Sequence, residues 1–184
     1  METLLLLAVA LAMDSVAVSI AIGSKYRELL FSKIVLIAAV FGLFQGVMPL
    51  LGYLAGIGFA DYVRSYSHWI AFALLTGLGG KMLYEAYQDE LDGELTDLSN
   101  KALFSLALAT SIDALAVGVT FAFIQTDILR ASLIIALVTL LLCLIAVYIG
   151  KKLGSLLESK AEVLGGVILI LLGIKMLLEG MEIV

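Results

Sequence analysis

Cysteine, proline and histidine each occur only once in this 184-residue sequence. The single Cys143 excludes an intramolecular disulfide and the paired-cysteine motifs of zinc and redox sites. No stripe of basic residues with interleaved aromatic side chains is present, so the usual surface for nucleic acid is missing. The opening METLLLL carries Glu2 where a cleaved signal peptide would carry basic residues, and we expect it to begin a retained helix.

Apolar residues are abundant instead. They make up 62% of the chain, and the mean hydropathy is +1.13, whereas roughly half of a soluble protein is apolar. Six apolar runs reach the length of about 20 residues that crosses a bilayer. Lipid offers no partners to backbone N–H and C=O groups, so each run is predicted to be a helix. The predicted spans are Thr3–Gly23, Ser32–Gly56, Tyr66–Tyr87, Lys101–Ile124, Ala131–Gly150 and Ala161–Gly180.

One stretch of the sequence occurs twice. LAVALAMDSVAVSI and LALATSIDALAVGV align with Asp14 over Asp113, 99 residues apart, and Gly52 and Gly150 match at an offset of 98. The chain is therefore predicted to contain two three-helix halves, residues 1–87 and 101–184, joined by an acidic linker, 88–100. Three spans per half force the halves into opposite orientations. The predicted fold is an all-α integral membrane protein with six transmembrane helices, arranged as two inverted three-helix repeats.

Lysine and arginine are unevenly distributed among the predicted loops. With the N-terminus outside, seven of them fall in inner loops and two in outer loops. Basic residues concentrate on the cytoplasmic side of membrane proteins. We therefore expect both termini outside. The inner residues are Lys25, Arg27, Lys33, Lys101, Lys151, Lys152 and Lys160, and the outer ones are Arg64 and Arg130.

Asp14 and Asp113 lie near the centres of their predicted spans, roughly 16 Å and 18 Å along them. A carboxylate at that depth is costly and usually belongs to a pathway or a ligand site. Two facing carboxylates would repel, and a divalent cation would neutralise both. Metal binding would then release protons, which is a physical basis for exchanging metal against H⁺. The alternative for each aspartate is a structural hydrogen bond or ion pair.

Other oxygen donors lie close to the aspartates or at similar depth. Ser15 adjoins Asp14, and Thr110 and Ser111 precede Asp113. Each hydroxyl has an alternative role in helix packing. Such oxygen donors suit Mg²⁺, Ca²⁺ or Mn²⁺ better than Zn²⁺ or Cu⁺. The predicted metal ligands are Asp14, Asp113, Gln45, Ser111, Thr110 and Ser15.

Gln45 lies four residues before Pro49, whose ring frees the Gln45 carbonyl from its helical hydrogen bond. A backbone oxygen and an amide oxygen would then lie together at membrane depth, where both suit a hard cation. A proline kink with an interhelical amide hydrogen bond is the alternative interpretation. Cys143, at the matching position of the second half, is expected to pack as a small hydrophobic residue.

The chain resembles the MntP family of manganese efflux pumps. The resemblance rests on AMDSVAVSI, FGLFQGVMPLLGY, HWIAFALLTGLGGKM, ATSIDALAVGVTFAF and AEVLGGVILILLGIKML. It implies a multi-pass exporter of Mn²⁺ in the bacterial cytoplasmic (inner) membrane, with Asp14 and Asp113 as the family's membrane aspartates. Some members carry an acidic residue at the position of Gln45, so the amide here would lower the negative charge of the site.

These observations predict a secondary transporter rather than an enzyme. Its expected partners are the transported Mn²⁺, protons as coupling ions and the lipid bilayer, with no separate cofactor and no nucleic acid. Whether it forms a homo-oligomer is left open. The alternatives are an exporter of another small cation or an amino acid, a non-transporting membrane scaffold, and an intramembrane aspartyl protease. No glycine-flanked GxGD-type loop accompanies Asp113 to favour the protease.

Overall fold

The computed structural model describes residues 2–58, 98–124 and 126–153, with scattered residues from 69 to 84 and from 163 to 178. In this part of the chain every regular element is a helix. Four of the six predicted spans are observed as helices long and apolar enough to cross a membrane. The other two predicted spans, 66–87 and 161–180, and the predicted linker lie largely outside the described residues. The helices are α1 (Glu2–Lys25), α2 (Phe31–Ile57), α5 (Asn100–Thr110), α6 (Ile112–Phe123) and α7 (Ile128–Leu153).

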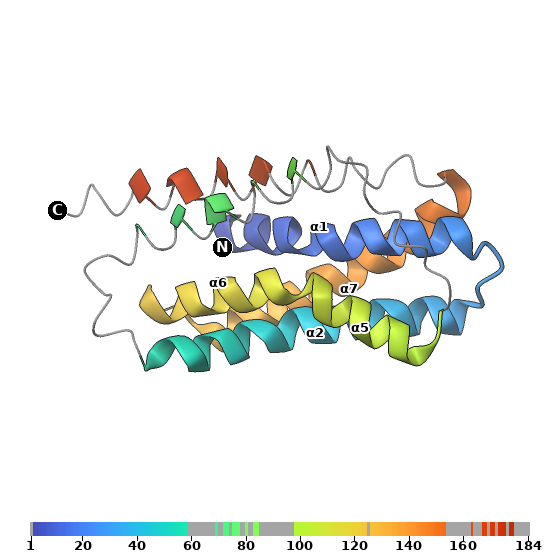
Figure 1. Cartoon of the computed structure of the whole chain (residues 1–184), viewed down its shortest axis with the longest axis horizontal. Helices are drawn as coiled ribbons and strands as arrows, with labels where there is room; N and C mark the ends of the chain where they lie inside the picture. Colours follow the sequence, from blue (N-terminus) through green and yellow to red (C-terminus); the bar gives the residue numbers. More distant parts are fainter. Residues whose placement is uncertain are drawn as a thin grey trace.

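The helices form one elongated bundle. α7 packs along both α1 and α2, and α6 packs along α2. Figure 1 shows α1 and α7 running in one direction and α2, α5 and α6 running in the other. The matching helices of the two halves, α1 with α5–α6 and α2 with α7, are therefore antiparallel, as an inverted duplication requires. The complete six-helix inverted repeat stays a prediction, because the third helix of each half lies largely outside the described residues.

Glycines lie where the helices cross most closely. Gly52 of α2 and Gly118 of α6 pack against each other's helix, and Gly23 of α1 and Gly150 of α7 do the same. A Cβ atom added at any of these four positions would overlap a backbone carbonyl of the neighbouring helix. Small residues at crossings are the usual way for membrane helices to approach closely, because lipid provides no hydrophobic force that drives helices together.

Two buried apolar clusters fill the bundle. The first contains Leu11 and Met13 of α1, Val117 of α6 and Ile135 of α7. The second contains Ile22, Phe41, Ala107, Cys143 and Val147.

Polar residues occupy the stretches between the two clusters. α1 passes from Met13 to Ile22 through Asp14 and Ser15, and α5–α6 passes from Ala107 to Val117 through the break between these helices. We call this region the polar layer. Its residues are Asp14, Ser15, Gln45, Thr110, Ser111, Asp113 and Thr139.

Candidate metal site

The fourth predicted span is broken in its middle, whereas the sequence predicted one continuous helix over 101–124. Ser111 has φ −104° and ψ 5°, and it both ends α5 and precedes α6. Its backbone N–H and its hydroxyl both donate to the carbonyl oxygen of Leu108, at 3.3 Å and 3.0 Å. The hydroxyl of Thr110 donates to the Ala107 oxygen at 3.3 Å. These hydroxyls compete with the helical ladder for carbonyls, which explains a break without proline or glycine.

The corresponding part of α1 is unbroken. At the positions that match Thr110 and Ser111, α1 carries Leu11 and Ala12, which have no hydroxyl to bond backwards. The two halves therefore differ at the point where their aspartates lie. A broken helix leaves the last carbonyls of one segment and the first N–H groups of the next without their usual partners. At membrane depth, such carbonyls are available as cation ligands.

Asp113 lies in the first turn of α6, immediately after the break. Its side chain is 7% exposed, and its Oδ1 accepts a hydrogen bond from the backbone N–H of Ala114 at 2.7 Å. The helix dipole makes this end of α6 a favourable place for a negative charge. The break therefore gives the buried carboxylate a polar environment that a continuous helix would lack.

Ser15 joins the two halves within the polar layer. Its hydroxyl donates to the Thr110 hydroxyl across 3.3 Å, which links α1 to the end of α5. Ser15 is fully buried, and its neighbour Asp14 is half-buried. The structure thus brings together two of the predicted ligand side chains, those of Ser15 and Thr110.

Gln45 of α2 also contacts α1. The side chain is fully buried, and its Nε2 donates to the backbone oxygen of Leu11 at 2.7 Å. This is the interhelical amide bond that the sequence left as an alternative. The Gln45 Oε1 atom has no hydrogen-bond partner among the described residues. Since Leu11 precedes Ser15 by one helical turn, the amide lies at the edge of the Asp14–Ser15 segment.

The same glutamine lies level with the break in the second half. Pro49 of α2 packs against Gly118 of α6, and these two helices run in the same direction (Figure 1). One turn back along both helices, position 45 lies opposite Ala114, the neighbour of Asp113. Gln45 is therefore placed between the two segments that carry the aspartates.

Thr139 of α7 is a member of the layer that the sequence did not predict. It lies between Ile135 of the first apolar cluster and Cys143 of the second. Its side chain is fully buried, and its hydroxyl oxygen has no hydrogen-bond partner in the described part of the chain. The repeat gave no signal, because the matching residue in the first half is Phe41. Cys143 packs in an apolar cluster, as its sequence context indicated.

The described residues contain no group of three or more histidine, cysteine, aspartate or glutamate side chains that could hold a metal ion. A cation in the polar layer would therefore be held by a mixed set, with at most two carboxylates and several neutral oxygens. Neutral oxygens from an amide, hydroxyls and backbone carbonyls are hard ligands. They favour Mg²⁺, Ca²⁺ and Mn²⁺ over soft metals.

Comparison with known proteins gives one consistent result. The sequence profile described as "Putative manganese efflux pump" matches residues 28–177. A protein of Campylobacter curvus named "Putative manganese efflux pump MntP" is 51% identical over 175 residues, which cover 95% of each chain. Proteins with the same name from Rippkaea orientalis and Aliarcobacter butzleri are 48% and 43% identical, over 96% and 97% of this chain and 95% and 99% of their own. No solved structure matches the fold. The chain belongs to the family of manganese efflux pumps, which are membrane transporters and not enzymes.

Proposed function

We propose that this protein exports Mn²⁺ across the bacterial cytoplasmic membrane and binds the ion in the polar layer. The buried Oε1 atom of Gln45 carries the proposal, because a buried polar atom without a partner is costly unless a ligand satisfies it. Asp14 and Asp113 supply the charge that a divalent ion requires. Ser15, Thr110 and Ser111 supply hydroxyls beside them.

The choice of manganese rests on the family and not on the ligands. Hard oxygen donors at about 2.0–2.6 Å serve Mg²⁺, Ca²⁺ and Mn²⁺ alike. Only the names of the relatives select manganese among the three. Gln45 contributes an amide and no charge, so the proposed site carries two negative charges and matches one divalent ion.

We further propose that proton entry drives export. Two carboxylates from opposite halves repel when no ion lies between them, and a proton on one of them relieves the repulsion. Metal binding then displaces that proton, and release of the metal allows a proton from the other side to return. The same two carboxylates thus carry metal in one direction and protons in the other.

The orientation in the membrane is part of the proposal. The C-terminal ends of α1 and α7 and the N-terminal ends of α2 and α5 share one end of the bundle (Figure 1). These four helix ends carry lysines, whereas Arg130 lies near the start of α7, at the other end. The rule for basic residues assigns the lysine-rich end to the cytoplasm. Export then moves Mn²⁺ away from that end. The lysines are Lys25, Lys33, Lys101, Lys151 and Lys152.

The test is Mn²⁺ flux in proteoliposomes, measured with an entrapped metal-sensitive dye. The native chain should carry Mn²⁺. Asp14→Asn and Asp113→Asn should each reduce the Mn²⁺ flux at least about tenfold, because each removes half of the site's negative charge. Glu2→Gln is the matched control, since it removes an exposed carboxylate from the same helix as Asp14. Native flux in either aspartate variant contradicts the proposed site. No flux in the native chain contradicts the function.

Proton exchange has a separate test. The same vesicles are prepared with an imposed pH gradient, and Mn²⁺ flux is compared with flux at equal pH. Flux should rise when protons can move opposite to the metal. An unchanged flux would reject the proton part of the proposal and leave metal transport standing. Excess Mg²⁺ or Ca²⁺ in the same assay measures selectivity.

A further inference from the structure

The second helix of each half crosses the first helix of the other half, and both crossings use a glycine at the same repeat position. Gly52 of α2 packs on the carbonyl oxygen of Leu115 in α6, and Gly150 of α7 packs on the carbonyl oxygen of Ile20 in α1. Gly52 and Gly150 are the same position of the repeat, 98 residues apart. If the halves were symmetric, Gly150 would lie on Val16, because Val16 is the repeat position of Leu115. The observed contact is four residues further along α1.

The reverse contacts show the same displacement. Gly118 of α6 packs on Pro49, and Gly23 of α1 packs on Val147, which is the repeat position of Pro49. The repeat position of Gly118 is Ser19 and not Gly23. Both sets of contacts therefore give a difference of four residues between the halves. This is about one helical turn, or about 6 Å along the helix.

Each first helix has two small residues that can occupy the crossing. They are Ser19 and Gly23 in α1, and Gly118 and Ala122 in α6, and each pair is four residues apart. Residues at this spacing share one helix face, and small side chains there permit a helix crossing at either position. Because Ser19 and Ala122 carry a Cβ atom, a crossing at either of them must be wider than the crossings at Gly23 and Gly118, where an added Cβ would overlap a backbone carbonyl. The α1 crossing uses the second residue of its pair, and the α6 crossing uses the first.

We propose that the transport cycle exchanges these two registers. α1 moves one turn along α7, so that Ser19 replaces Gly23 against Val147. α6 moves one turn along α2, so that Ala122 replaces Gly118 against Pro49. Ser19 and Ala122 then lie at the crossings in the exchanged register. This inference rests on the proposed function, and it supplies the movement that the function requires.

The movement acts directly on the metal site. α1 carries Asp14 and α6 carries Asp113, so each shift displaces one carboxylate by about 6 Å relative to the neighbouring helix. One-turn shifts between packed helices are a known form of two-state transition. In an inverted repeat, exchanging the conformations of the halves gives a mirrored state that faces the other side of the membrane. The two states then place the same repeat positions at the crossings, with the roles of the halves exchanged.

Two disulfides can report the two registers separately. In the register seen here Ser19 lies beside the Cys143 thiol, so Ser19→Cys in the native background traps this state. Ser19→Cys with Val147→Cys, in a Cys143→Ser background, traps the shifted state. A disulfide requires Cα atoms about 4.4–6.8 Å apart. A difference of about 6 Å along the helix is therefore enough to separate the two pairs.

Both pairs should form disulfides on oxidation in proteoliposomes, and each should stop Mn²⁺ flux until a reductant is added. The single variants Ser19→Cys and Val147→Cys, both with Cys143→Ser, are the controls and should transport. If they transport and Ser19→Cys forms its disulfide with Cys143 but the shifted pair never does, the register exchange is wrong and the exporter stands. If the native protein carries no Mn²⁺, the function itself fails. A flux that survives complete oxidation of the shifted pair also overturns the exchange.

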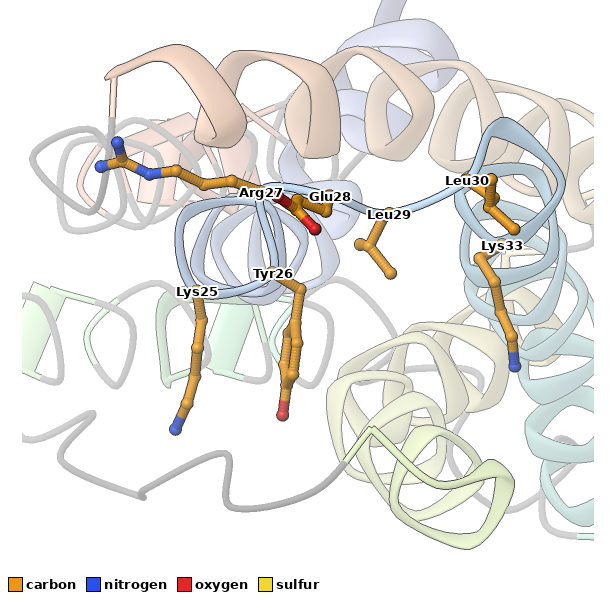
Figure 2. Close-up of a pocket in the computed structure, with 7 residues that line it drawn as sticks. All are labelled: Lys25, Tyr26, Arg27, Glu28, Leu29, Leu30 and Lys33. Atoms are coloured by element: carbon orange, nitrogen blue, oxygen red, sulfur yellow. The ribbon is translucent and has the colours of Figure 1, made fainter.

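A second inference rests on a separate feature, the connection between α1 and α2. It forms an open hollow of about 460 Å³ lined by Lys25, Tyr26, Arg27, Glu28, Leu29, Leu30 and Lys33. Figure 2 shows Lys25 and Tyr26 at the end of α1 and Lys33 in α2 extending to the same side, while Arg27 points away. Lys151 of α7 donates to the Leu29 oxygen at 3.1 Å and attaches the connection to the bundle.

The hollow lies where two helices long enough to span a membrane end, and the ends of such helices reach the headgroup region of a bilayer. Leu30 and Phe31 are 72% and 77% exposed beside it, and they can contact acyl chains. Basic pockets at the ends of spans bind anionic headgroups. We propose that Lys25 and Lys33 bind the phosphate of an anionic phospholipid, with the Tyr26 hydroxyl as a further donor.

Native mass spectrometry of protein released from phosphatidylglycerol–phosphatidylcholine nanodiscs tests the lipid site. Phosphatidylglycerol should be retained over phosphatidylcholine, and retention should fall at least about fivefold in Lys25→Gln/Lys33→Gln. Lys101→Gln is the control, because it removes a lysine from α5 at the same end of the bundle. Equal retention in the double variant overturns the proposal. Displacement of the lipid by millimolar inorganic phosphate also overturns it, because the site would then recognise free phosphate.

Discussion

Gln45 donates its amide N–H to the backbone oxygen of Leu11 at 2.7 Å, and this bond joins α2 to α1 at a fully buried point. The donor side of the amide is therefore satisfied by protein, and its oxygen stays available in the polar layer. Because the N–H end of the amide is held by α1, the Gln45 oxygen is the atom that a bound ion would contact.

Gln45→Leu should separate transport from stability. Leucine has a similar volume, and the lost hydrogen bond costs about 1 kcal/mol, partly offset by removal of the buried oxygen. Thermal unfolding in detergent should therefore change little. Mn²⁺ flux should fall by roughly tenfold, the effect of losing about 1.4 kcal/mol of ion binding. Ser132→Ala is the control, since it removes a buried hydroxyl outside the polar layer. Normal flux in Gln45→Leu would exclude the amide as a ligand.

Ser15→Ala and Thr110→Val test the contact between the halves. The hydroxyls are 3.3 Å apart, so each substitution should cost about 0.5–1.5 kcal/mol of stability. The double variant should lose less than the sum, because both changes remove the same contact. Denaturant titration of all four proteins measures this difference. Additive losses would show that the contact contributes nothing to stability.

The break at Ser111 should be removable by giving the second half the residues of the first. Thr110→Leu/Ser111→Ala installs the equivalents of Leu11 and Ala12, which lie in an unbroken helix. The freed carbonyls should then re-enter the helical ladder. Hydrogen exchange at the Ser111–Leu115 amides should slow, and Mn²⁺ flux should be lost. Slowed exchange together with normal flux would show that the break is not required for transport.

Gly52→Ala should destabilise the bundle, because the added Cβ would overlap the Leu115 carbonyl oxygen. Overpacking of this kind typically costs about 1–3 kcal/mol. Gly58→Ala is the matched control, since Gly58 follows α2 with φ −62° and open space around an added Cβ. Its stability should be unchanged. Equal stability of the two variants in thermal unfolding would contradict the close crossing of α2 and α6.

Much of the described fold was predictable, because backbone N–H and C=O groups in lipid must form their hydrogen bonds within a helix. Hydropathy and length located four helices to within a few residues, as α1 (predicted Thr3–Gly23, observed Glu2–Lys25) illustrates. The break at Ser111 was not predicted, since it depends on hydroxyls that can either bond backwards or stay in a helix. The hydroxyls of Ser15 and Thr110 are 3.3 Å apart, and the role of these two residues and of the aspartates as ligands stays a prediction.

Contacts between helices depend on how far each helix is shifted along its neighbour, and this shift cannot be deduced from one sequence. Gln45 was singled out for its spacing from Pro49, but only the packing of α2 shows that its Nε2 reaches Leu11 and its oxygen does not find a partner in the described chain. Thr139 was missed because its repeat partner is Phe41. The one-turn difference between the halves is likewise seen only in the packing of the helices.

The two apolar clusters on either side of the polar layer offer no oxygen ligands to an ion, and in the proposed transport cycle we call them the seals. A hydrated ion entering either seal would lose its water without gaining ligands, and the cost of a bare charge in such a medium amounts to several kcal/mol even after relaxation. Passage therefore requires one seal to open while the other stays shut. The expected behaviour is that of a carrier, with one ion moved in each turnover, rather than the continuous current of a channel.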